Sequence, residues 1–255
     1  MRIALSIEYE GTQYAGWQRQ PNAPHVSTVQ DKLEKALSLI ADHPVTAICA
    51  GRTDRGVHAK GQVAHFDTES TRPIDAWILG TNTKLPSDIC VRFAKQVADD
   101  FHARFSALAR HYCYVIDTRS VRSALLRNHV TWHPYVLDVS LMNEAGQYLI
   151  GEHDFSAYRS QHCQSSSTLR NVHHVNVTRE DHFIKIDIKA NAFLHNMVRN
   201  IVGVLMVIGA GKASPNWARH VLDSKDRRQA ADTASPTGLY LMAVEYPVEF
   251  NVEVK

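Results

Sequence analysis

The stretch Ala50-Gly51-Arg52-Thr53-Asp54-Arg55-Gly56-Val57-His58-Ala59-Lys60-Gly61-Gln62 (AGRTDRGVHAKGQ) holds one carboxylate among three glycines and three cations. Residues 45–50 and 62–68 on either side read as strands, so we expect the stretch to connect them. Thr-Asp-Arg-Gly by itself is ordinary turn chemistry, because Asp bonds the backbone locally and Gly accepts left-handed geometry. The cations nevertheless favour an ionised carboxylate, which a nucleophile requires. The local sequence leaves both interpretations of Asp54 open.

The segments around this stretch predict an α+β first half. Residues 2–9 alternate between apolar and polar side chains, which indicates a half-buried strand. Ser27 and Gln30 have the spacing of a capping box, and an apolar stripe from Val29 to Ile40 predicts a helix behind it. A further helix over 75–84 and a strand over 88–96 complete the order β-α-β-β-α-β, which is typical of a split βαβ unit.

The rest of the chain repeats a similar rhythm of strands and helices. We expect strands at 111–117, 171–178, 183–189 and 239–246. Helices are expected at 141–150 and 193–208, and Ser214-Pro215 has the sequence of a cap followed by the first residue of another helix. The chain therefore reads as two α+β halves, which we place at residues 1–105 and 106–255.

Composition and cysteine usage indicate a cytoplasmic globular protein with no membrane segment. The longest apolar run, 201–210, contains two glycines and is flanked by polar residues, which favours a buried helix over a membrane span. The four cysteines lie far apart without a CxxC pair, as in reduced proteins. The fifteen histidines match no metal-binding motif, so we expect neither a metal nor a cofactor.

Positive charge is concentrated locally although the net charge is only +2. Residues 102–133 contain five arginines and a single acidic residue, and Tyr112, Tyr114 and Trp132 lie among them. Guanidinium planes and aromatic faces suit phosphates and unstacked bases, but a solvated basic surface explains the same composition equally well.

Arg199 lies on the expected helix 193–208, opposite its apolar stripe and near Asn196 and Gly203. The helix becomes apolar on all sides after Ile201, so we expect Arg199 to point into protein or a cleft. A buried guanidinium needs an anion, and Asp54, Asp154, Asp187 or an RNA phosphate could supply it. We regard Arg227, by contrast, as a surface arginine.

Six sequence blocks, taken in order, resemble the tRNA pseudouridine synthase A (TruA) family over nearly the whole chain. They are GTQYAGWQ (11–18), GRTDRGVHA (51–59), FHARFS with RHYCY (101–106 and 110–114), GEHDFSA (151–157), FLHNMVR (193–199) and GLYL (238–241). Two departures are Arg55, where the family usually has alanine, and the run Ala234-Ser235-Pro236-Thr237 before the last block.

The resemblance implies a fold, an activity and site residues. The fold would be the α+β pseudouridine synthase fold, with two related α/β-sandwich-like halves around a central mixed, mainly antiparallel sheet and a catalytic cleft. Asp54 would be the catalytic aspartate and Arg199 its ion-pair partner, Tyr112 would pack on the target base, and Arg52 would take part in base flipping and RNA contact. The family acts as a cytoplasmic homodimer, without metal or cofactor, on tRNA uridines 38, 39 and 40 of the anticodon stem-loop.

Two rival functions remain for comparison. A catalytically silent tRNA-binding module of the same fold would bind tRNA without forming pseudouridine, although the presence of Asp54, Tyr112 and Arg199 argues against it. A histidine-dependent metallohydrolase ranks third, because no metal motif supports it.

Overall fold

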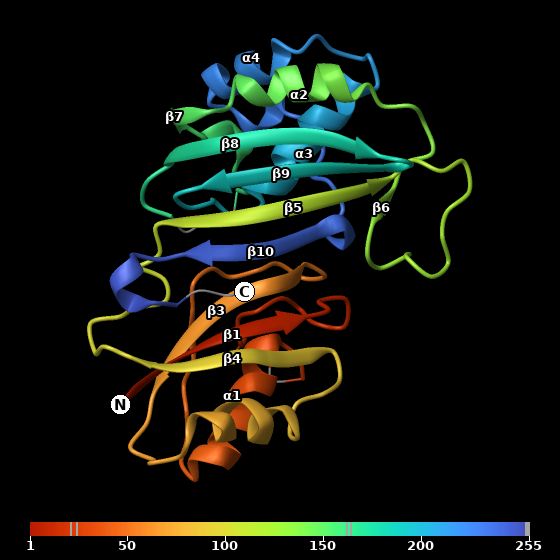
Figure 1. Ribbon diagram of the computed structural model, residues 1–255. Coiled ribbons are helices and arrows are strands. Elements are labelled where there is room, and N and C mark those ends of the chain that lie inside the picture. The colour runs from red at the N-terminus through yellow and green to blue at the C-terminus, as the bar shows by residue number, and fades with distance from the viewer. Residues whose placement is uncertain (21, 24, 162, 164, 253–255) are drawn as a thin grey trace. The chain divides into compact units, whose positions relative to one another are not determined.

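The computed structural model describes residues 1–20, 22–23, 25–161, 163 and 165–252, and the chain forms two compact units (Figure 1). The first unit contains residues 1–108 and 240–252, and the second contains residues 109–239. Among the described residues, no helix has both the length and the apolar character needed to cross a membrane.

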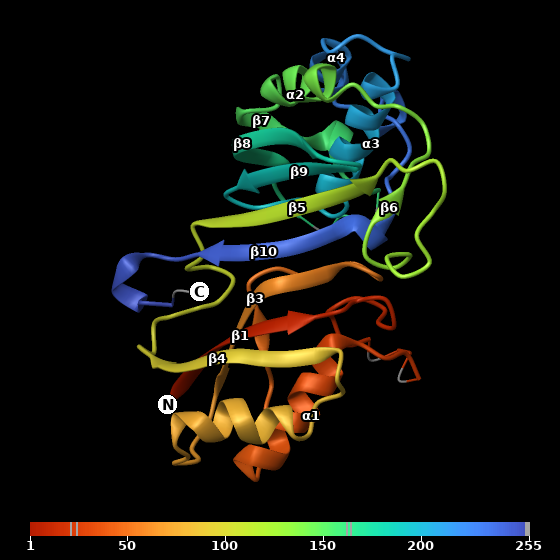
Figure 2. The same ribbon diagram turned by 45° about the vertical axis from the view of Figure 1, so that its right-hand side comes forward.

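The first unit is built on a mixed, mainly antiparallel sheet. Its strands are β1 (Arg2–Tyr9), β2 (Ile48–Cys49), β3 (His58–Asp67), β4 (Ile89–Val97) and β10 (Leu239–Glu245). The order is β4-β1-β3-β10, with β2 also paired to β3. These pairs are antiparallel except that β10 runs parallel to β3. Figures 1 and 2 show α1 (Val29–Ala41) beside the sheet, next to the short π-helix η1 (Ala76–Gly80) that contacts both α1 and β4.

β1 is more deeply buried than its alternating sequence predicts. Ile3, Leu5 and Ile7 have no exposed surface, but neither have Ala4 and Ser6 on the other face. The strand lies between β3 and β4, so both of its edges are paired, and its small alternate residues let both faces be covered. The prediction of a half-buried strand was therefore wrong in burial and right in position.

The first helix begins one residue later than the capping-box spacing predicts. Thr28, not Ser27, is the N-cap, and its hydroxyl accepts a hydrogen bond from the Asp31 amide. Gln30 does not take part in the cap. Its side chain is buried and donates to Glu34 (2.8 Å), which shows that tertiary packing overrode the local cap pattern.

The second unit contributes mainly antiparallel strands with three helices packed beside them. The strand order is β5 (Ala109–Asp117), β9 (Phe183–Ala190), β8 (Leu169–Glu180) and β7 (Gly151–Asp154), and β6 (Thr131–Trp132) pairs in parallel with β5. The helices are α2 (Val139–Gln147), α3 (Met197–Gly209) and α4 (Trp217–Ser224). Ile184, Ile186 and Ile188 are completely buried, so the alternation of β9 correctly predicted the face that enters the core.

Helix starts in this unit differ from the sequence prediction. α3 begins at Met197, because Asn196 adopts a left-handed conformation (φ 62°) that separates 193–196 from the helix. Ser214-Pro215 precedes the last helix without capping it, and Asn216 is the N-cap of α4. Three short 3-10 helices also belong to the second unit: η2 (Ser156–Tyr158), η3 (Arg227–Gln229) and η4 (Pro236–Gly238). A fourth, η5 (Val248–Phe250), belongs to the first unit.

The α+β class and the mainly antiparallel sheets are confirmed. The expected division after residue 105 assigned the final strand to the second half. In the structure the units change at Leu108 and Ala109, and residues from Tyr240 onward return to the first unit. The reason is the parallel pairing of β10 with β3, a long-range contact that no local pattern encodes.

His65 of β3 generates a prediction about pH. Its side chain is only 2% exposed, and Nδ1 accepts a hydrogen bond from the Ala103 amide (3.1 Å). Burial lowers the pKa of His65 to about 4. In the unfolded chain the pKa of this histidine is about 6.5. Between pH 6.5 and about 4 the unfolded chain therefore binds a proton at this position and the folded chain does not, so the free energy of unfolding falls as the pH drops over this range.

We expect this histidine to account for about 3 kcal/mol of that loss, because one pKa unit corresponds to about 1.4 kcal/mol. His65→Gln keeps an acceptor but does not titrate, so its free energy of unfolding should fall less over this pH range. Urea unfolding at a series of pH values measures it, with His25→Gln, at an exposed position, as the control. Parallel pH profiles for wild type and His65→Gln would contradict the assignment.

Candidate functional site

Asp54 lies at the start of a tight turn in the first unit. The Val57 amide donates to the Asp54 carbonyl (3.2 Å), and Gly56 has a positive φ of 77°. Asp54 is half-buried, whereas Arg52 and Arg55 are exposed. The structure thus contains the turn that the local sequence predicts, with an exposed arginine on each side of Asp54 in the sequence.

The residues just before Asp54 are fixed by buried hydrogen bonds. The hydroxyls of Tyr9 and Thr53 are 2.7 Å apart, and the Trp17 amide donates to the Thr53 carbonyl at 3.0 Å. The Gln62 amide group donates to the Gly51 carbonyl at 2.7 Å. The loop therefore has a defined path even though Arg52 and Arg55 are exposed.

Two glycines of the 11–18 block let the backbone of this loop pack against them. A Cβ on Gly16, whose φ is +93°, would lie 2.5 Å from the Thr53 carbonyl oxygen and 3.0 Å from the Asp54 carbonyl carbon. A Cβ on Gly11 would lie 2.0 Å from the Val57 carbonyl oxygen. No side chain fits at either position, so glycine here positions the Asp54 turn.

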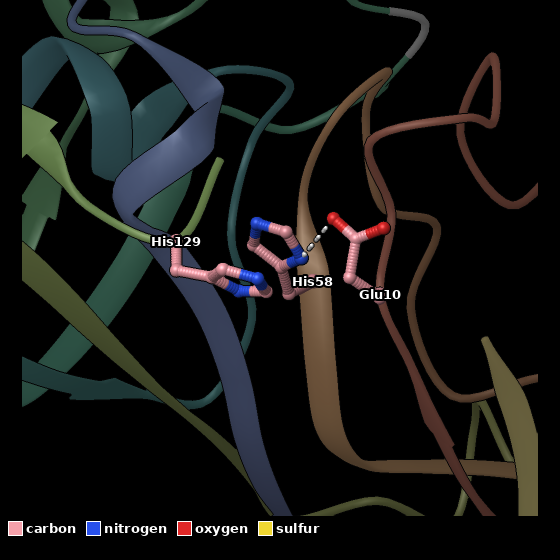
Figure 3. A group of neighbouring side chains, drawn as sticks. All are labelled: Glu10, His58 and His129. Atoms are coloured by element: carbon pink, nitrogen blue, oxygen red, sulfur yellow. Dashed lines mark ion pairs between the residues drawn. The ribbon is translucent and has the colours of Figure 1, made fainter. Parts of the chain in front are cut away.

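His58 connects three separate segments of the first unit. Its Nδ1 accepts a hydrogen bond from the Gly11 amide (3.0 Å), and a carboxylate oxygen of Glu10 lies 3.6 Å from the same nitrogen (Figure 3). Its ring stacks on Tyr240, with centroids 4.8 Å apart. The sequence blocks at 11–18, 51–59 and 238–241 are therefore brought together around one side chain.

Tyr112 and Arg199 belong to the second unit. Tyr112 lies on β5, and its ring meets Phe193 edge to face at 5.1 Å. On α3, Arg199 Nε donates to the Ala234 carbonyl (2.7 Å) and Nη1 donates to Asn196 Oδ1 (3.1 Å). Two of the anions that we considered as partners of Arg199 are hydrogen-bonded to other residues. Asp154 accepts from the Ser156 amide, and Asp187 is bonded to the His111 ring.

Asn200 is an organising residue that sequence reasoning missed. It has no exposed surface, and its amide donates to the Tyr158 carbonyl at 2.7 Å. Its Oδ1 accepts from Thr233 Oγ1 (2.6 Å) and from Arg227 Nη2 (3.1 Å). This network holds the segment whose Ala234 carbonyl orients Arg199. A polar residue next to Arg199 in an otherwise apolar helix was the available signal.

Arg227 therefore is not the surface arginine that we expected. It is half-buried and bonds both Asn200 and Thr233. One of its two acceptors, Asn200, comes from α3 and is 27 residues away in the sequence, so the local sequence around Arg227 does not reveal it.

Comparisons with known proteins agree with the sequence resemblance. The family described as tRNA pseudouridine synthase matches residues 5–106 and 145–247, which include Arg52, Asp54 and Arg199 but not Tyr112. Proteins named tRNA pseudouridine synthase A are similar over 99% of this chain. They include those of Vibrio parahaemolyticus (55% identity, 94% of the relative covered), Aliivibrio fischeri (54%, 95%) and Histophilus somni (56%, 93%).

The close packing at Gly16 predicts a large effect of adding one methyl group. Gly16→Ala should destabilise the protein by about 2 kcal/mol or more, because the new Cβ both clashes with Thr53 and requires an unfavourable φ. Urea unfolding measures the change.

Gly51→Ala is the matched control in the same loop, because a Cβ at Gly51 meets nothing within 4 Å. We expect its stability to stay within about 1 kcal/mol of wild type. Equal unfolding midpoints for the two variants would show that Gly16 does not constrain the turn.

Proposed function

The chain belongs to the tRNA pseudouridine synthase family, and we propose that it isomerises uridines 38, 39 and 40 in the anticodon stem-loop of tRNA with Asp54 as nucleophile. The observation that carries the proposal is the construction of the Asp54 turn. Gly11, Gly16 and His58, all from blocks that resemble the family, pack on this turn or bond to its supports.

The reaction is an isomerisation and needs no redox partner or group donor. The N1–C1′ glycosidic bond of uridine breaks, the uracil turns, and a C5–C1′ bond forms. The C5 proton leaves to a base and N1 gains a proton, so the atoms balance. The Asp54 carboxylate would add covalently to ribose C1′ or to uracil C6 and be released at the end.

The other site residues would bind the RNA. A paired uridine must leave the helical stack first, which costs a few kcal/mol. We propose that exposed Arg52 contacts the RNA while the base is flipped, and that Tyr112 packs on the extruded base. Arg199, whose guanidinium is already oriented by Ala234 and Asn196, would be a substrate-binding cation.

The resemblance also supports a cytoplasmic homodimer that works without metal or cofactor. Reduced cysteines agree with that compartment, since all four are free thiols in the structure. A catalytically silent tRNA-binding protein is the alternative, and it differs from the proposal in one measurable outcome, the formation of pseudouridine.

Asp54→Asn tests the nucleophile directly. The amide is nearly isosteric but cannot attack, so tritium release from tRNA labelled at uridine C5 should fall about a thousandfold or more. Filter binding of the same tRNA should stay close to wild type, because the loop path depends on backbone contacts. Chemical mapping of pseudouridine in tRNA treated with wild-type protein tests positions 38–40.

Turnover by Asp54→Asn at the wild-type rate would refute the nucleophile assignment. Binding by the wild-type protein without any pseudouridine in the tRNA would instead favour the silent module.

Arg199→Ala should lower kcat/KM for tRNA by about tenfold to a thousandfold, because a charged hydrogen-bonding group to substrate or reaction centre is removed. Arg219→Ala is the matched control. Arg219 is exposed on α4 and pairs with Asp223 of the same helix (3.0 Å), so its loss should change activity by less than about twofold. Equal activities for the two variants would remove Arg199 from the site.

A further inference from the structure

A tightly bonded turn at residues 102–106 lies outside the site described above. The Ser106 amide donates to the His102 carbonyl (2.9 Å), and the His102 amide donates to Ser106 Oγ (3.0 Å). The amides of Arg104 and Phe105 both approach His102 Nδ1 at 3.2 Å. These four bonds fix the backbone that carries Phe105.

Phe105 is strongly exposed in spite of this rigid support. Its side chain is 76% exposed, although burying a phenylalanine normally contributes favourably to folding. A single exposed apolar residue is common and needs no explanation by itself. What distinguishes Phe105 is that its ring has a fixed partner beneath it.

The ring of Phe105 lies on a column of aromatic rings that leads into the core. It contacts the ring of His102 in a tilted arrangement, with centroids 4.3 Å apart and planes at 31°. His102 in turn contacts His65 at 4.8 Å, and His65 contacts Phe101 at 5.9 Å. The exposed ring is therefore held in place from below and needs little ordering when a ligand binds.

Positive charge lies beside the same ring and close to the Asp54 loop. The Arg104 guanidinium is 5.5 Å from the Phe105 ring centroid. Burial raises the pKa of the Cys49 thiol to about 12, and the positive charges of Arg52 and Arg104 both oppose that rise. Cys49 ends β2, directly before the loop that carries Asp54.

We infer that Phe105, supported by His102 and flanked by Arg104, is a stacking platform for an unpaired base of the bound RNA. The inference rests on the proposed function, because it assumes an RNA substrate. Aromatic rings hold unstacked bases without regard to their identity, and an adjacent arginine can contact the flanking phosphate. Neither the sequence blocks nor the family comparison assigns this role to Phe105.

The test compares tRNA affinities of variants at Phe105. Phe105→Ala should raise the Kd for an unmodified tRNA transcript by about 5- to 150-fold, the range for losing one base stack. Phe105→Leu keeps an apolar side chain without a π face and should recover little of the loss. Phe105→Trp should restore affinity, whereas kcat at saturating tRNA should change little in all three.

Salt dependence separates stacking from charge. Arg104→Ala should reduce the slope of log Kd against log salt by about one, because one phosphate contact is lost. Phe105→Ala should weaken binding without changing this slope. Leu79→Ala, at a 66% exposed apolar position on η1, is the control and should bind tRNA as the wild type does.

Wild-type affinity in Phe105→Ala or in Phe105→Leu would overturn the platform, as would a Phe105→Trp variant that binds no better than Phe105→Ala. Melting temperatures of the variants should match wild type, since the side chain is exposed. A wild-type protein that makes no pseudouridine would overturn the proposed function, whereas these affinities decide the platform separately.

Discussion

The close contact between two backbone segments, residues 11–16 and residues 53–57, is the constraint on which the Asp54 turn depends. At Gly16 the two backbone segments lie so close together that a single methyl group would overlap the Thr53 carbonyl oxygen. Trp17, next to Gly16, is buried, and its backbone amide donates a hydrogen bond to the Thr53 carbonyl. The hydroxyl groups of Tyr9 and Thr53 are also hydrogen-bonded to each other. The direction of the turn is thus set by backbone packing.

Many residues in the sequence blocks that resemble the family hold neighbouring segments of the backbone in place. His58 stands only four residues after Asp54, yet its ring joins the turn region to Gly11 and Tyr240. Asn200 follows Arg199 directly and holds the segment that orients it. The resemblance therefore covers the residues that position the candidate site as well as the site residues themselves. For this reason several short blocks in the same order are more specific than a match at a single residue.

Local patterns predicted the elements well and the connections between distant segments poorly. The alternation of β9 correctly gave both its position and its buried face, because each residue's side is fixed by the strand period. The pairing of β10 with β3, the burial of both faces of β1 and the partners of Arg227 all depend on distant residues, so no window of sequence contains them. At the candidate site, the turn at Asp54 was predictable from Gly56, whereas the roles of Gly11 and Gly16 became visible only with the segment that packs against them.

The return of β10 to the first unit also has a consequence for biosynthesis. The second unit is an insertion between β4 and β10, so the ribosome delivers all of it before the strand that completes the first sheet. Domains usually fold as units while the chain emerges, but the first unit must wait for Tyr240, Tyr246 and Phe250, which pack on His58 and Phe101. A nascent chain therefore carries the Asp54 turn without this support until β10 has been synthesised.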